Sequence, residues 1–310
     1  MTDPAARPTP RLTLGPLLYH WPAAKRRAFY QAIADHGPYQ EVVLGETVCS
    51  KREAPVAEAM AEAEVRLKAA GRAVVRPTIG LAVAEEEVAA LEAVARTANA
   101  GALIEANDVG ALALLSGQPH HIGPMVNVYN EGTLTALAER GATCVTLPWE
   151  LPRDSVLALA RRARDLGIDC GVTVFGRAPL AISARCYHAR AHGLTKATCR
   201  LICDQDPEGL PVDTLDGDAF MVVNGLQTQA DAVTLMVREI PEMVEAGVTA
   251  LRVSPLDVDM VAVGQAYADL LAGRIDDLAA EDRLLDLLED RPVANGFYHA
   301  APGADWVAAE

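Results

Sequence analysis

Short runs of apolar, often β-branched residues recur along the chain, and longer stretches rich in alanine, leucine and charged residues separate them. Short continuous apolar runs are typical of buried parallel strands, and the stretches between them are typical of amphipathic helices. The runs that we interpret as strands are RLTLGPLLY (11–19), EVVLGE (41–46), AVVRPTIG (73–80), ALIEAND (102–108), PMVNVYN (124–130), TCVTLPWE (143–150), DCGVTVFG (169–176) and TALRVSP (249–255).

This alternation of strands and helices predicts an α/β fold. We interpret the eight units as a closed (β/α)8 barrel of the TIM-barrel kind, formed by a single domain over residues 1–310. An open, doubly wound sheet is the alternative. It is less favoured because no glycine-rich phosphate-binding motif follows the first strand.

One connection breaks the alternation after the seventh strand. Roughly fifty residues, 176–227, separate this strand from the next long helix, whereas such connections usually have about 2–6 residues. The segment ends in DTLDGDAFMVVNGLQT, whose Asn-Gly pair predicts a hairpin turn. Because long loops on a rigid scaffold often carry function, we expect this insertion to cross the barrel mouth.

Four cysteines are candidate metal ligands. Cys186, Cys199 and Cys203 lie in the insertion with the spacing C-x12-C-x3-C, and residues four apart share one side of a helical turn. Cys49, in GETVCSKR, follows the second strand and lies at the same end of the barrel, so it can reach the other three. The spacing alone leaves open whether it does. It also leaves open whether four thiolates would hold zinc or an iron–sulfur cluster.

Basic residues surround the three cysteines of the insertion, and we expect them to offset negative charge and lower the thiol pKa values. These residues are Arg185, His188, Arg190, His192, Lys196 and Arg200.

Other chemically notable residues are expected at the opposite end of the barrel. Cys144 and Cys170 lie near strand starts, and we interpret them as small buried side chains. His120 and His121 precede the expected fifth strand, so we interpret them as surface or turn residues.

Polar residues near the C-terminal ends of the strands are candidate substrate-binding residues, since these ends form the barrel mouth. They are Glu46, Arg76, Glu105, Asn127, Arg177 and Arg252. The three arginines can clamp a dicarboxylate through paired hydrogen bonds, or pair with nearby glutamates in a network that only stabilises the mouth. Both interpretations stay open, and the sequence identifies no catalytic residue.

Three segments in combination resemble the peptidase U32 family: GETVCSKR, FGRAPLAISARCYHAR with its cysteine spacing, and MVVNGLQT. The resemblance extends from about residue 11 to the end, and it points to the members that act in oxygen-independent ubiquinone biosynthesis. It implies a barrel-like fold and a [4Fe-4S] cluster held by Cys49, Cys186, Cys199 and Cys203. It also implies a heterodimer with a paralogous cluster-bearing subunit. The pair would hydroxylate a ubiquinone precursor that a sterol-carrier-like protein presents, with prephenate as the oxygen donor.

Charge and hydropathy exclude some classes of binding partner. The net charge of -15 argues against nucleic-acid binding, which needs lysine and arginine concentrated on one face. No apolar run approaches the roughly 20 residues that span a bilayer, and residues 1–21 lack a signal-peptide pattern. We therefore expect no transmembrane segment and a cytoplasmic location.

Two other functions remain open from the sequence. One is a structural or assembly subunit stabilised by zinc, and the other is a peptidase of the U32 type. No Ser/His/Asp or Cys/His arrangement stands out to support a peptidase.

Overall fold

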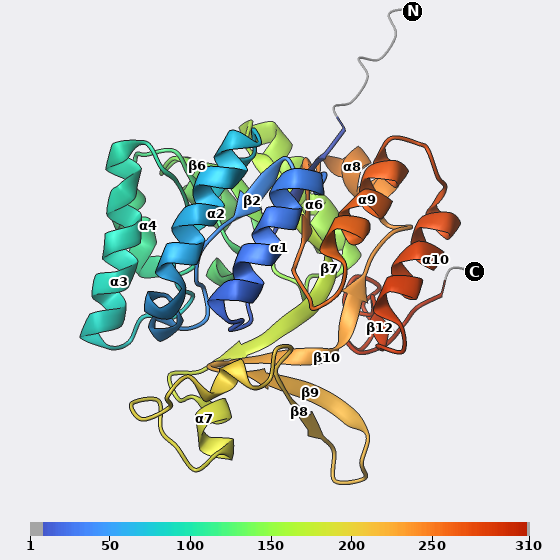
Figure 1. The fold of residues 1–310 in the computed structure, drawn as a ribbon. Helices are drawn as coiled ribbons and strands as arrows, with labels where there is room; N and C mark the ends of the chain where they lie inside the picture. The colour runs from blue at the N-terminus through green and yellow to red at the C-terminus, as the bar shows by residue number, and fades with distance from the viewer. Residues whose placement is uncertain (1–8, 309–310) are drawn as a thin grey trace, which may run out of the picture.

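The computed structural model describes residues 9–308, so part of the 1–21 segment and residues 309–310 lie outside it. Eight parallel strands form a barrel in the order β11–β1–β2–β3–β4–β5–β6–β7, and β11 also pairs with β7, which closes it. This confirms the predicted barrel (Figure 1). The strands are β1 (Arg11–Leu14), β2 (Glu41–Val43), β3 (Ala73–Pro77), β4 (Leu103–Ala106), β5 (His120–Ile122), β6 (Ala142–Thr146), β7 (Asp169–Ile182) and β11 (Ala250–Val253).

Helices follow the strands and cover the outside of the barrel (Figure 1). They are α1 (Ala23–His36), α2 (Ala57–Ala69), α3 (Glu85–Arg96), α4 (Val109–Leu115), α5 (Glu131–Ala138), α6 (Arg153–Leu166), α8 (Ile240–Ala246), α9 (Met260–Leu271) and α10 (Asp277–Leu288). None of the described helices is both long and apolar enough to cross a bilayer.

The predicted fifth strand, 124–130, is wrong. The strand at this place in the barrel is β5, and residues Pro124–Val126 form a short 3-10 helix, η4. Pro124 has no backbone N–H for a strand ladder, and Val128 lies in the loop after η4, from which its side chain packs into the core. His120 and His121 are therefore buried strand residues, not surface or turn residues.

The insertion grows out of the seventh strand. Gly176 has a φ of +118°, and a side chain there would meet Ser254 at 2.6 Å, so glycine allows β7 to pass close to β11 as it leaves the barrel. The far half of β7 pairs antiparallel with β10 (Gln227–Leu235). The added elements are α7 (Tyr187–Ala191), η5 (Ile202–Asp204), β8 (Leu210–Asp213) and β9 (Ala219–Asn224), while β12 (Val293–Ala294) pairs with β10.

The hairpin predicted from the Asn-Gly pair is present. β9 and β10 are antiparallel neighbours, and Asn224 pairs with Gln227 across the turn. The hairpin and α7 lie together at one end of the barrel (Figure 1).

A buried ion pair crosses the interior of the barrel. Nη1 of Arg252, on β11, lies 2.6 Å from Oε2 of Glu105, on β4, and both side chains are buried. Asn107 donates to the other oxygen of Glu105 at 3.0 Å. Burial opposes ionisation of Glu105, but the guanidinium of Arg252 holds the pKa of this carboxyl below its ordinary value.

Arg252→Met leaves the carboxylate of Glu105 buried without its cation, so it should lower the free energy of unfolding by about 3–5 kcal/mol. Urea unfolding followed by circular dichroism measures this. The double variant Arg252→Met, Glu105→Gln removes both charges, keeps an acceptor for Asn107 and should recover most of the loss. Equal stabilities of the wild type and the single variant would show that the pair contributes little.

Candidate functional site

Three segments bring the four candidate cysteines together at the end of the barrel where β7 leaves it. Cys49 lies between β2 and the 3-10 helix η1 (Ser50–Arg52), Cys186 caps α7, and Cys203 lies in η5. Cys186 belongs to a small apolar cluster against which Cys49 and Cys199 also pack. All of these are free thiols. Cys144 and Cys170 are buried in β6 and β7, as predicted.

Glu46 fixes the loop that presents Cys49. One carboxylate oxygen, Oε1, accepts hydrogen bonds from the backbone N–H groups of Val48 at 2.8 Å and Cys49 at 3.1 Å. The other oxygen, Oε2, is buried without a hydrogen bond and lies 3.9 Å from Nη2 of Arg26. Glu46 therefore sets the backbone conformation of the Cys49 loop and keeps one oxygen unused.

Arg52, which we did not single out from the sequence, is fully buried beneath the cysteines at 0% exposure. Its Nη1 donates to the carbonyl of Leu18 at 2.8 Å, and its Nη2 donates to Oδ1 of Asn224 at 2.9 Å. A side chain at Gly225, whose φ is +66°, would lie 2.4 Å from Nη2, so the guanidinium needs a glycine there. The segments GETVCSKR and MVVNGLQT, far apart in sequence, thus meet at one arginine.

The thiols and Arg52 interact electrostatically. Burial raises the pKa of the Cys49 thiol to about 11, and it also raises the pKa of Cys203; Arg52 opposes both shifts. The expected lowering of thiol pKa values in the insertion is therefore wrong for Cys203, because desolvation outweighs the nearby positive charge. Desolvation likewise raises the pKa of Cys49, which that expectation did not cover.

Arg52 gives an independent test of whether a metal centre fits this site. Its Nε is buried and has no hydrogen-bond partner, and the guanidinium interacts electrostatically with the carboxylate of Glu46 first and then with Cys203 and Cys49. An unsatisfied buried donor on a cation is costly unless negative charge lies beside it. Four thiolates carrying an anionic cluster match this requirement, so the residues fit the group that the cysteine spacing suggests.

A second contact ties the insertion to the barrel. Nζ of Lys51, two residues after Cys49, donates to the backbone carbonyl of Lys196 at 2.7 Å. Lys196 in turn forms an ion pair with Glu87, on α3. The first contact holds the loop that leads to Cys199 against the loop that presents Cys49, and the second holds it against α3.

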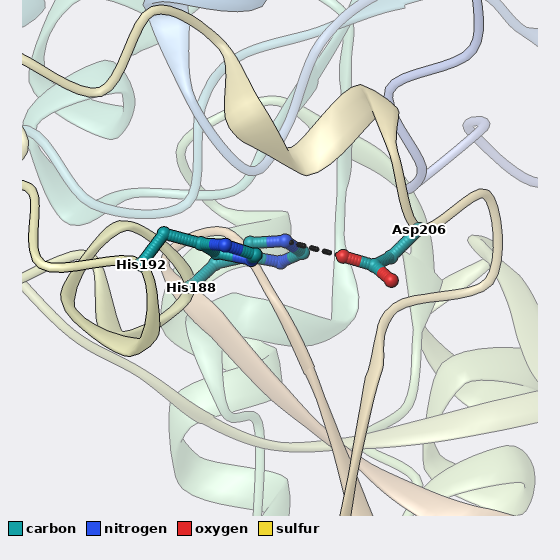
Figure 2. Close-up of side chains that lie close together, drawn as sticks. All are labelled: His188, His192 and Asp206. Carbon is teal, nitrogen blue, oxygen red and sulfur yellow. Dashed lines mark ion pairs between the residues drawn. The ribbon is translucent and has the colours of Figure 1, made fainter.

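Three other ligand-type side chains lie in the insertion: His188, His192 and Asp206 (Figure 2). Among residues 9–308, their ligand atoms form a group of three that all lie within 4.8 Å of one another. His188 follows Cys186 by two residues and Asp206 follows Cys203 by three, so the group lies close in sequence to the candidate thiol ligands.

The six predicted substrate-binding residues do not form one site. Glu105 and Arg252 form the interior ion pair. Arg177 donates to the backbone carbonyls of Asp231 at 3.0 Å and Glu208 at 2.9 Å. The Arg252–Glu105 pair matches the pairing with a glutamate that we left open for the arginines, whereas Arg177 binds backbone carbonyls.

Asn127 is exposed in the loop after η4 and lines a cavity of about 190 Å³ with Tyr129. Glu46 and Arg76 line a different cavity, and there Arg76 makes a two-pronged ion pair with Glu64.

This second cavity, of about 380 Å³, lies between α2 and α3. α2 packs on α1, and α3 packs on α4 (Figure 1). Its apolar wall is formed by Leu44, Val56, Met60, Ile79, Leu91 and Val94. Because Glu46 lines the cavity and also binds the Cys49 backbone, the cavity adjoins the cysteine site.

This chain matches a protein-family model over most of its length, namely the model of peptidase family U32 at residues 22–308. Among solved structures, a mutant O-GlcNAc hydrolase of Thermobaculum terrenum is similar with a TM-score of 0.45 and 10% identity, over 91% of this chain and 64% of that one. A ligand-free mutant tryptophan synthase from M. tuberculosis is similar with a TM-score of 0.40 and 15% identity, over 89% of this chain and 94% of that one. This chain thus spans less than two thirds of the hydrolase.

Arg52→Met should loosen the insertion while the barrel stays folded. The change leaves Oδ1 of Asn224 unsatisfied, at about 1–3 kcal/mol, while the carbonyl of Leu18 keeps the hydrogen bond from Nδ2 of Asn224. A change of 1.4 kcal/mol is a factor of ten in population. We expect proteolytic cleavage within 183–226 to accelerate by at least about tenfold, as measured by mass spectrometry of limited digests. Arg185→Met changes an exposed arginine of the same insertion and should have no effect. Equal cleavage rates in the two variants would contradict the role given to Arg52.

Proposed function

Because this chain belongs to peptidase family U32, we propose that it is a UbiV-type subunit of a complex that hydroxylates ubiquinone precursors without oxygen. In this proposal, Cys49, Cys186, Cys199 and Cys203 hold a [4Fe-4S] cluster. The single observation that carries it is that Cys49, Cys186 and Cys199 meet in one small apolar cluster, while the buried guanidinium of Arg52 interacts with Cys49 and Cys203.

Charge supports a metal centre held by four thiolates. Such a centre is anionic, and Arg52 supplies a buried positive charge that interacts with Cys49 and Cys203. The choice of a [4Fe-4S] cluster over a zinc ion rests on the resemblance to the UbiV-type members of the family.

When bound, the cluster supplies one-electron transfer. The protein's own residues hold the site: Glu46 orients the Cys49 loop, Arg52 joins it to the β9–β10 turn, and Lys51 fixes the approach to Cys199. The apolar wall of the cavity between α2 and α3 suits the ring of a lipid precursor, and its volume falls within the range of small-molecule sites. Oε2 of Glu46 makes no hydrogen bond and lies 3.9 Å from Nη2 of Arg26, which also lines the cavity.

The remaining parts of the proposal rest on the resemblance to UbiV. A UbiU-like paralogous subunit forms the heterodimer, a sterol-carrier-like protein presents the lipid, and prephenate supplies the oxygen atom. The complex works in the cytoplasm. We assign this chain electron transfer, or support of the partner's active site.

Cys49→Ala should remove iron as completely as Cys199→Ala, because a [4Fe-4S] cluster that loses one thiolate is destabilised. The measurement is iron per chain after anaerobic purification with the UbiU-like partner. Cys144→Ala is the matched control, since that thiol is buried in β6, and it should keep the wild-type iron content. The ligand assignment is overturned if Cys144→Ala empties the site and Cys49→Ala does not.

Filling the cavity should lower hydroxylation without removing iron. Ala93 of α3 lines the cavity, and Ala89 lies one turn earlier on the same helix without lining it. We expect Ala93→Trp to reduce hydroxylated ubiquinone precursors in anaerobic cells, as measured by mass spectrometry, with iron content unchanged. Ala89→Trp should behave as the wild type. Full product formation by Ala93→Trp would exclude the cavity as the site for the ring.

A further inference from the structure

A compact set of nitrogen and oxygen ligands lies close in sequence to the thiols, outside the proposed cluster. His188 and His192 are four residues apart at α7, and Asp206 approaches them from the loop after η5 (Figure 2). The two imidazole rings stack with centroids 5.6 Å apart and an interplanar angle of 17°. The ligand atoms of all three residues lie within 4.8 Å of one another.

The hydrogen bonds of His188 fix which ring nitrogen is free to bind a ligand. Nδ1 lies 3.1 Å from the backbone carbonyl of Val223, which only accepts, so Nδ1 carries the proton. Nε2 of the neutral ring then presents its lone pair. A metal-binding histidine almost always donates its other N–H to a carbonyl or carboxylate in this way.

Asp206 approaches the same ring nitrogen that the Val223 contact leaves free. Its Oδ2 lies 2.8 Å from the buried Nε2 of His188, and a neutral ring protonated at Nδ1 has no hydrogen at Nε2 to donate to the carboxylate. Two ligands of one ion, each about 2.0–2.2 Å from it in neighbouring positions, lie about 3 Å apart. The observed placement matches two ligands that share an ion.

We propose that His188, His192 and Asp206 bind a divalent first-row transition-metal ion, separate from the four-thiol site. Two imidazoles and one carboxylate select ions such as Fe²⁺, Co²⁺ or Zn²⁺. Three protein ligands leave further positions for water or for an oxygen atom of a substrate. His192 is exposed and Asp206 is partly exposed, so solvent and small molecules reach the site.

Cobalt titration of the full chain, purified anaerobically with the partner, tests this site. Co²⁺ bound by nitrogen and oxygen gives d–d bands alone, whereas Co²⁺ bound by thiolates adds an intense sulfur-to-metal band in the near ultraviolet. We expect one equivalent of Co²⁺ to bind with d–d bands alone. His192→Gln and Asp206→Asn should each weaken binding by more than the roughly 10- to 100-fold that loss of an outer-shell partner causes.

Two control variants test whether a loss of Co²⁺ binding is specific to the proposed ligands. Asp204→Asn removes an exposed carboxylate two residues from Asp206, and His299→Gln removes a histidine that pairs with Glu239 elsewhere. Both should bind Co²⁺ like the wild type, and circular dichroism should show all four variants folded. The proposal is overturned if Co²⁺ gives only the thiolate band, or if His192→Gln and Asp206→Asn bind as the wild type does. A failure here would leave the iron content of the thiol site unchanged, so it is distinguishable from failure of the proposed function.

Discussion

The buried guanidinium of Arg52 is the constraint on which the site depends. Taking an unpaired cation out of water costs several kcal/mol, so the surrounding structure must supply negative charge and acceptors. The barrel supplies the carbonyl of Leu18, and the insertion supplies Oδ1 of Asn224. The thiols of Cys49 and Cys203 lie beside the same cation. One arginine thus links the loop after β2, the hairpin of the insertion and the candidate ligands.

The barrel makes this arrangement possible because it brings the loops after β1, β2 and β7 to one end. β7 extends beyond the barrel and carries the insertion back over that end, where β10 pairs with it. Glu46 connects the cysteine site to the apolar cavity. Its Oε1 accepts a hydrogen bond from the backbone N–H of Cys49, and its Oε2, which has no hydrogen bond, lies 3.9 Å from Nη2 of Arg26 at the cavity. The Arg252–Glu105 pair lies in the interior and stabilises the barrel below these loops.

The pattern of apolar runs predicted the fold because short buried strands need continuous apolar residues, and seven of the eight expected strands are present. The fifth expected strand, 124–130, is absent, because its apolar residues are buried for another reason: Val128 packs into the core from a loop. The convergence of Cys49 with the insertion followed from topology, since strand ends of a barrel meet. Arg52 could not be predicted, because its partners Leu18 and Asn224 are distant in sequence and become neighbours only in the folded chain.

The predicted substrate-binding residues lie in several separate places for a similar reason. Position at a strand end does not determine which way a side chain points, so Arg252 pairs across the interior while Arg76 turns outward to Glu64. The pairing of His188 with Asp206 depends likewise on how the insertion folds back on itself. The sequence marked His188 only as one of several basic residues, and no periodic pattern connects it to a carboxylate in a later loop.

The central claim is that Cys49, Cys186, Cys199 and Cys203 hold an iron–sulfur cluster. Mössbauer spectroscopy of the ⁵⁷Fe-labelled protein, purified anaerobically with the proposed UbiU-like partner, tests it most directly, together with total metal analysis. The account predicts four iron atoms per chain and the spectrum of a [4Fe-4S] cluster with thiolate ligands. A colourless protein with one zinc ion per chain and no iron would contradict it.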